Sequence, residues 1–204
     1  MEHASFIFTI FFMLLGPIKI IPGFLKLTHE ADRSFKRELA IKASLIASAI
    51  VAYVAVLGEG LLVKYAISFE ALRIAGGLVL LISALNIIFP PREPSKAALS
   101  KPTALQLAIS PLAVPIIVPP AGVAAILIFT MLTPRYPGME WVIAQALATV
   151  MVLDFLVMLF ADTIAKIPGL LLVFQVTGAV LVFIQVALAT ETILSAFKSL
   201  GVFK

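Results

Sequence analysis

Apolar residues in this chain are gathered into six long stretches, which are separated by short polar segments. Each stretch reaches the ~20 residues that an α-helix needs to cross the ~30 Å hydrocarbon core of a bilayer. The alternation of apolar and polar residues that is typical of a membrane β-barrel is absent. The pattern therefore predicts an all-α membrane protein with six transmembrane helices. The predicted spans cover residues 4–25, 39–63, 69–89, 105–131, 140–161 and 170–195.

Composition supports a membrane protein and restricts its function. Of the 204 residues, 62% are hydrophobic and 13% are charged, whereas a soluble domain carries roughly 25% charged residues. Six spans use nearly the whole chain, so we expect one integral membrane domain over 1–204 and no soluble catalytic domain. Cysteine, an HExxH motif and a P-loop are absent, and His3 and His29 are too far apart to suggest a metal site. We therefore expect no enzyme activity and no metal.

Basic residues predict how the chain is oriented in the membrane. The net charge of +4 could suggest nucleic acid, but the basic residues lie in short loops between the spans, so we expect no nucleic-acid partner. The loops at 26–42, 90–104 and 162–169 carry nine Lys and Arg residues, and the other side carries four. Because positively charged loops stay in the cytoplasm, we expect a multi-pass protein of the cell membrane with both termini outside.

A linker rich in proline and charge, PPREPSKAALSKP at 90–102, lies between the third and fourth spans. It divides the chain into half-repeats at about 1–89 and 103–197, with three spans each. An odd number of spans gives the two halves opposite orientations. A repeat in this chain must therefore be inverted.

The third and sixth spans carry the sequence evidence for such a repeat. LRIAGGLVLLISAL at 72–85 aligns with FQVTGAVLVFIQVA at 174–187, and Gly76 then meets Gly178. Small residues such as these and Gly77 let helix backbones approach closely, so we predict that all three glycines are helix-packing positions. Chance similarity is the alternative, because small residues recur at helix contacts.

Prolines interrupt the first and fourth spans, in GPIKIIPGF at 16–24 and SPLAVPIIVPPAG at 110–122. Proline removes a backbone donor and clashes with the carbonyl four residues earlier, so it kinks or breaks a helix. Broken helices in corresponding places of two halves point to the binding site of a transporter. Simple kinks are the alternative, because proline is common in transmembrane helices. The predicted substrate-binding residues are Pro17, Lys19, Ile20, Pro22, Pro111, Pro115, Pro119, Pro120 and Ala121.

A broken helix offers groups of both polarities to a ligand. The freed carbonyls can accept from an ammonium group or coordinate Na⁺, and the new helix N-termini attract carboxylates. A zwitterionic amino acid needs both kinds of partner.

Two charged residues, Lys19 and Asp154, lie deep inside predicted spans, whereas Glu59, Glu70, Arg73 and Glu191 lie near span ends. An ionised side chain there costs at least ~2.5–3.5 kcal/mol. Both lie about 21–23 Å below the outer end of their spans at ~1.5 Å per residue, so we hypothesise an ion pair between them. The alternative is that Lys19 snorkels to the cytoplasmic interface while Asp154 faces another polar group. Asp154 is also the predicted ion-coupling residue.

Three segments resemble the MarC-related family of six-span membrane proteins: GPIKIIPGFLKLT (16–28), YAISFEALRIAGGLVLLISALNII (65–88) and SPLAVPIIVPPAG (110–122). The resemblance covers about residues 6–195. Some members of that family are described as transporters of small neutral amino acids. The resemblance implies an inner-membrane bundle of two inverted three-helix halves, with H⁺ or Na⁺ as the coupling ion and no other cofactor.

The chain departs from the family pattern at both proline motifs. The first motif commonly reads Asp-Pro-x-Gly-Asn-x-Pro and the fourth-span motif commonly ends Gly-Pro-Gly. The prolines are kept here, and the polar and flexible residues are not. The corresponding residues are Gly16, Pro17, Ile18, Lys19, Ile20, Ile21 and Pro22, and then Pro119, Pro120 and Ala121.

Two functions follow from these observations. The first is a secondary transporter of a small solute, a small neutral amino acid, by ion-coupled alternating access. The alternative is a structural or insertion-assisting membrane protein without transport activity, although such a protein would not need inward polar groups. The expected partners are membrane lipid and the small-molecule solute, and a homo-oligomer stays open.

Overall fold

The computed structural model describes residues 2–89 and 103–202, and all regular secondary structure in these residues is helical. The predicted linker at 90–102 lies outside the described residues. The elements are α1 (Glu2–Leu15), α2 (Pro17–Leu27), α3 (Arg33–Lys64), α4 (Phe69–Ile88), α5 (Ala104–Leu107), η1 (Ala108–Ile117), α6 (Pro120–Thr130), η2 (Thr133–Arg135), α7 (Met139–Leu159), α8 (Ala161–Ala165) and α9 (Leu170–Ser199).

The membrane spans follow the predicted apolar stretches. Within the described residues, five segments are long and apolar enough to cross a membrane: Ala4–Leu27, α3, α4, α7 and α9. Ala104–Ile117 and Pro120–Arg135 pass the same test only as a pair, and they are bent by 59° relative to each other. The chain is therefore an all-helical protein with five spans, or six when the bent pair counts as one.

Capping residues set several of the helix ends. The side chains of Asp32, Ser68 and Thr103 each accept a hydrogen bond from the backbone N–H three residues later, at the starts of α3, α4 and α5. Gly138 and Gly169 precede α7 and α9 with φ of 83° and 78°, a conformation that glycine adopts without steric cost. The polar turns between apolar stretches thus end one helix and begin the next.

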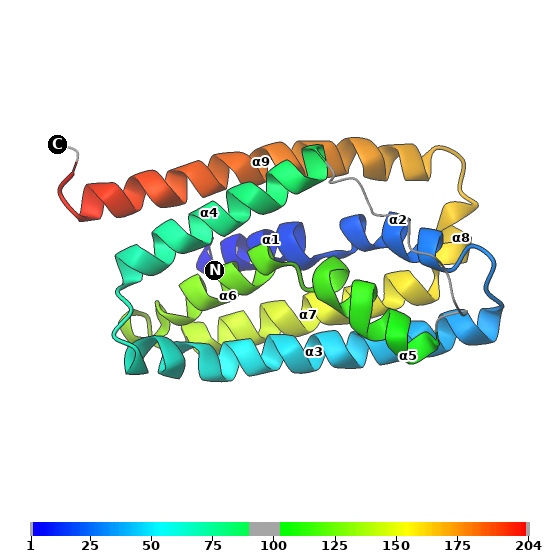
Figure 1. The fold of residues 1–204 in the computed structure, drawn as a ribbon, viewed down its shortest axis with the longest axis horizontal. Helices are drawn as coiled ribbons and strands as arrows, with labels where there is room; N and C mark the ends of the chain where they lie inside the picture. Colours follow the sequence, from blue (N-terminus) through cyan, green and yellow to red (C-terminus); the bar gives the residue numbers. More distant parts are fainter. Residues whose placement is uncertain (1, 90–102, 203–204) are drawn as a thin grey trace.

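The long helices lie side by side in a bundle (Figure 1). α4 packs along α9 at one side of the bundle and α3 packs along α7 at the other, with α1, α2 and α6 between them. The core lies where α1 meets α6 and α7. There the fully buried ring of Phe11 packs edge-on against the ring of Phe129, with 5.4 Å between the ring centroids. α9 leaves apolar side chains such as Phe183 exposed, and we infer that they face lipid.

Corresponding elements of the two predicted halves run in opposite directions in Figure 1. The first span, formed by α1 and α2, opposes the direction of η1 and α6, and the pairs α3–α7 and α4–α9 are each antiparallel. An inverted repeat requires this arrangement. The repeat itself stays a prediction.

The first span changes conformation at Gly16, between α1 and α2. Gly16 has extended backbone angles, φ −77° and ψ 176°. A Cβ atom at this position would lie 2.1 Å from the carbonyl oxygen of Phe12, so the close approach requires glycine. Pro17 follows at the first position of α2, where proline is tolerated, and Pro22 lies inside α2 without ending it.

The fourth span changes conformation more strongly. Ser110 and Val114 are non-helical, with φ/ψ of −142°/126° and −132°/122°, and each precedes a proline, Pro111 or Pro115. The ring of a proline disfavours the helical region for the residue before it. Pro119, with φ −72° and ψ 157°, then caps the start of α6.

The predicted packing glycines differ in their surroundings. A Cβ atom on Gly76 would lie 2.8 Å from Ile128 Cδ1 of α6, and one on Gly77 would lie 2.9 Å from the carbonyl oxygen of Ala189 in α9. Both positions therefore allow a close helix contact. A Cβ atom on Gly178 would meet no atom within 4 Å. The packing role predicted for Gly178 is wrong, because this part of α9 borders open space.

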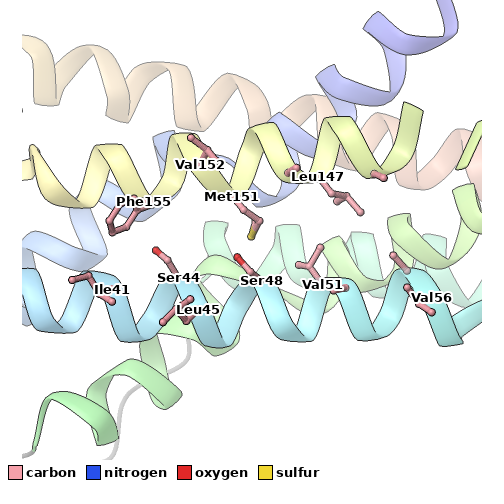
Figure 2. Close-up of a pocket in the computed structure, with 14 residues that line it drawn as sticks. Ile41, Ser44, Leu45, Ser48, Val51, Val56, Leu147, Met151, Val152 and Phe155 are labelled. Atoms are coloured by element: carbon pink, nitrogen blue, oxygen red, sulfur yellow. The ribbon is translucent and has the colours of Figure 1, made fainter. Parts of the chain in front are cut away.

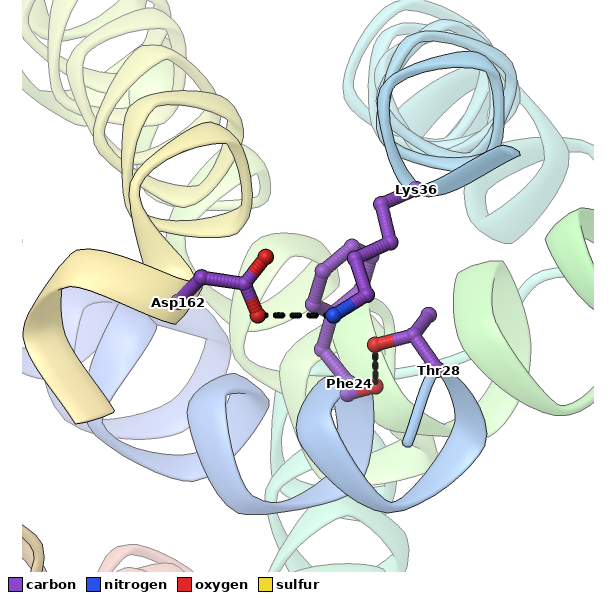
Figure 3. A network of polar contacts seen from close by, with 4 residues as sticks. All are labelled: Phe24, Thr28, Lys36 and Asp162. Carbon is purple, nitrogen blue, oxygen red and sulfur yellow. Dashed lines mark hydrogen bonds and ion pairs between the residues drawn. The ribbon is translucent and has the colours of Figure 1, made fainter. Parts of the chain in front are cut away.

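One ion pair joins the ends of α3 and α8, beside the end of α2 (Figure 3). Lys36 Nζ lies 2.7 Å from Asp162 Oδ1 and so joins the first turn of α3 to α8. Beside it, the buried Thr28 hydroxyl donates to the carbonyl oxygen of Phe24 at 2.8 Å, at the end of α2. These contacts lie at the end of the bundle for which we predict a cytoplasmic position.

Candidate functional site

A cavity of about 490 Å³ lies between α2, α4 and the bent fourth span. We call it the proline cavity. It combines one charged residue and two polar residues with three of the predicted prolines. These lining residues are Lys19, Ser83, Asn86, Pro115, Pro119 and Pro120, and the others are apolar.

The two interrupted spans meet beside this cavity. A Cβ atom on Gly122, in the first turn of α6, would lie 2.3 Å from Leu15 Cδ2, at the end of α1. One on Gly23 of α2 would lie 3.2 Å from Ile116 Cδ1 of η1. The first turn of α2 carries Lys19, and the first turn of α6 begins at Pro120. Two helix N-termini therefore lie close together, and their dipoles favour a negative group.

Lys19 is held by a hydrogen-bond chain that crosses to α4 and α9. Lys19 Nζ donates to Gln185 Oε1 at 3.0 Å, and Gln185 Nε2 donates to the carbonyl oxygen of Leu80 at 2.9 Å. Gln185 is fully buried. It lies 15 residues after Leu170 and 14 before Ser199, the ends of α9, which is about 21–23 Å from each end. The ammonium group thus lies at the level of the middle of α9, and we infer that it lies deep in the membrane.

Asp154 lies in α7 and is not the partner of Lys19. Its side chain is 1% exposed, and neither carboxylate oxygen has a hydrogen-bond partner among the described residues. No ion pair within 4 Å joins it to a described basic side chain. The ion pair hypothesised from the sequence is therefore wrong. An ionised carboxylate without a donor is costly in this environment, so a proton or a cation would have to accompany it.

A second cavity, of about 820 Å³, lies on the other side of Lys19 between α2, α4 and α9. We call it the lateral groove. Lys19 and Ile87 line both cavities. Gly178 lines the lateral groove, which explains the open space beside it. Lys19 therefore lies between the partly polar proline cavity and the largely apolar lateral groove.

A third cavity, of about 570 Å³, separates α3 from α7 (Figure 2). Ser44 and Ser48 of α3 point toward α7 and are its polar lining residues. The Ser44 hydroxyl is buried without a hydrogen-bond partner among the described residues. The other lining side chains are apolar, so this cavity offers no charged partner to a zwitterion.

The sequence matches the family model described as "MarC family integral membrane protein" over residues 1–197. The chain belongs to the MarC family. This MarC family chain is 25% identical over 201 residues to a UPF0056 membrane protein of Methanocaldococcus jannaschii, with 97% of each chain covered. It is 26% identical over 136 residues to the UPF0056 inner membrane protein YhgN of Escherichia coli K12, covering 67% of this chain and 68% of YhgN. No solved structure matches it.

Family membership confirms the resemblance found in the sequence and shows that the protein is an integral membrane protein. The names of the two relatives describe membrane proteins and mention no substrate. The chemistry of this MarC family protein therefore has to be inferred from its own cavities.

The predicted site residues of this MarC protein are divided among several places. Ile20 and Ala121 are 0% and 1% exposed and belong to the core, away from both cavities beside Lys19. Pro17 is buried at the start of α2, Pro111 lies in η1, and neither lines these cavities. Pro22 lines the lateral groove. The proline cavity holds the remaining four, namely Lys19, Pro115, Pro119 and Pro120.

Three polar residues of the site were not predicted as ligand-binding residues. These residues are Ser83 and Asn86 of α4 and Gln185 of α9. Gln185 bonds between helices, and its partner is the charged Lys19. Asn86 is the only asparagine in the chain, and its place in an apolar span was the signal that could have identified it.

Proposed function

We propose that this MarC family protein is a secondary transporter that moves a small neutral amino acid across the cell membrane by ion-coupled alternating access. The observation that carries the proposal is the proline cavity, in which the ammonium of Lys19 lies beside polar groups and an interrupted span. Its volume of about 490 Å³ is within the ~300–1,000 Å³ of small-molecule sites.

The lining groups suit the two charges of an amino acid. Lys19 Nζ donates one bond to Gln185, and an ammonium has three donors, so it can also bind the substrate carboxylate. The substrate ammonium needs acceptors, which Asn86 Oδ1 and Ser83 Oγ can supply. Pro115 and Pro119 have no N–H, so carbonyl groups of the fourth span lack their usual helical donor and can accept as well.

Alternating access needs a contact that changes when the two halves move against each other. The bond from Lys19 to Gln185 joins α2 of the first half to α9 of the second half. A substrate carboxylate that competes with Gln185 for the ammonium would couple binding to this contact. The opposed directions of corresponding helices (Figure 1) suit such a movement around a central site.

Asp154 is the proposed coupling residue. It is buried and has no partner among the described residues, so it can take up H⁺ or Na⁺ without first breaking a side-chain bond. Polar residues at membrane depth often serve ion pathways. In the proposed orientation both termini lie outside, and the Lys36–Asp162 pair (Figure 3) lies at the cytoplasmic end.

Counterflow in liposomes tests this function. The purified protein is reconstituted, and exchange of labelled glycine, alanine and larger neutral amino acids is measured with and without H⁺ and Na⁺ gradients. We expect counterflow of at least one of them, with gradient-driven uptake lost in Asp154→Asn. If protein that is shown to be folded moves none of the panel, the alternative of a structural or insertion-assisting protein is favoured.

A further inference from the structure

We infer that the lateral groove binds an amphipathic monocarboxylate of the fatty-acid class, with its carboxylate on Lys19 and its apolar chain between α2, α4 and α9. This site goes beyond the proposed transport of an amino acid. It is argued from the shape, the lining and the one charge of the groove.

The lining of the groove is apolar apart from two side chains. Among its described lining residues, Lys19 carries the only charge and Gln175 is the only other polar residue. Phe183 and Leu85 line it while remaining 75% and 42% exposed, so the groove opens on the surface that faces lipid. An apolar chain can therefore enter from the bilayer without crossing water.

The charge of Lys19 is not balanced by a carboxylate of the described residues. No described carboxylate forms an ion pair with Nζ within 4 Å, and its one hydrogen-bond partner is the neutral Gln185. Burying an ammonium is costly unless it is paired. A ligand that brings a single negative charge to this depth supplies the missing partner.

A free carboxylic acid matches the lateral groove better than a phospholipid. The groove offers one charged side chain, Lys19, in a lining that is apolar apart from Gln175, whereas a phospholipid brings two acyl chains and a larger head group. Along α9 the groove runs from Val186 back to Phe174, which is roughly 18 Å at 1.5 Å per residue. This length suits a medium-chain acid such as dodecanoate.

Photolabelling in liposomes tests the groove without requiring transport. A dodecanoate that carries a diazirine is irradiated with the reconstituted protein, and the labelled peptides are identified by mass spectrometry. We expect label on the residues of α2, α4 and α9 that line the groove, displaced by excess dodecanoate and not by dodecanol, which has the same chain and no charge. Equal displacement by dodecanol, displacement only by anionic phospholipid, or label elsewhere would overturn the inference.

Two variants with a matched control locate the site. Lys19→Met removes the charge, and Gly178→Leu fills the groove at a position where a Cβ meets no atom within 4 Å. Each of these two variants should lower the dodecanoate labelling about tenfold or more. Gly60→Leu is the control, because Gly60 is also a helical glycine with no atom within 4 Å of its Cβ position and lines neither cavity, so its labelling should equal that of the wild type. Undiminished labelling of folded Gly178→Leu would contradict the site.

The same variants separate this inference from the proposed function. Asn86 lines the proline cavity and not the lateral groove. If Asn86→Leu loses counterflow and keeps dodecanoate labelling, both ideas stand. Labelling without counterflow in the wild type would support the groove alone, and counterflow without labelling would overturn only the groove.

Discussion

Replacing Gln185 with leucine tests the polar contact that positions Lys19. The change removes the bond from Lys19 Nζ at 3.0 Å and the bond to the carbonyl oxygen of Leu80 at 2.9 Å. Leucine keeps most of the volume of glutamine, so the loss of polarity dominates over the loss of packing. The ammonium of Lys19 would then have no partner among the described residues.

The size of the effect follows from the kind of bond that is lost. A hydrogen bond to a charged group contributes ~1.5–3 kcal/mol in proteins, whereas polar side-chain contacts between membrane helices average ~0.6 kcal/mol with a maximum of ~1.7. Because Lys19 is only partly buried, we expect Gln185→Leu to lower the free energy of unfolding by about 1–2 kcal/mol. The bond to Leu80 contributes the smaller share, since that carbonyl lies inside α4.

A double-mutant cycle in mixed detergent and SDS micelles measures the contact, with unfolding followed by circular dichroism. Lys19→Met should cost less in the Gln185→Leu background than in the wild type, with a coupling energy of about 1 kcal/mol. A cycle between Lys19→Met and Asp154→Asn should be additive within ~0.5 kcal/mol. Additive Lys19 and Gln185 effects together with coupled Lys19 and Asp154 effects would refute the reasoning and restore the ion pair.

Three further variants test the packing, the charged end and the proline cavity. Gly77→Ala should lower the free energy of unfolding by about 1–3 kcal/mol, because its Cβ would lie 2.9 Å from a carbonyl oxygen of α9; Gly178→Ala should not lower it, and equal losses would contradict the contact. Asp162→Asn should cost at most ~1 kcal/mol by removing the pair with Lys36; the loss should shrink in about 1 M salt, and a larger, salt-independent loss would argue against a solvated pair. Asn86→Leu should abolish counterflow with unchanged thermal unfolding, and undiminished counterflow would exclude the proline cavity.

The spans could be predicted because long apolar stretches in a bilayer have few alternatives to helix. The last predicted span, 170–195, corresponds to α9 (Leu170–Ser199), and the bend in the fourth span lies where the prolines are dense. This part of the fold is local in the sequence.

The partner of Lys19 could not be predicted from depth alone. Many side chains share one level in a bundle, and packing decides which of them face each other. Lys19 meets Gln185, which is 166 residues away in the chain, while Asp154 is buried without a partner among the described residues. The packing role of Gly178 was predicted wrongly for a similar reason. The sequence alignment pairs Gly178 with Gly76, but it does not show that Gly76 lies at a helix contact and Gly178 at the lateral groove.

The absence of cysteine from the chain allows the most direct measurement of the central claim, that the proline cavity binds the solute. Ile82, an apolar residue of α4, lines the proline cavity and not the lateral groove. Ile82→Cys and Gly178→Cys each place a single thiol, in the proline cavity and in the lateral groove respectively, and the rate of modification by a membrane-permeant maleimide is measured in liposomes. We expect a transported neutral amino acid such as alanine to slow the modification of Ile82→Cys and not that of Gly178→Cys. Equal rates with and without the amino acid at Ile82→Cys, in protein that still shows counterflow, would contradict the claim.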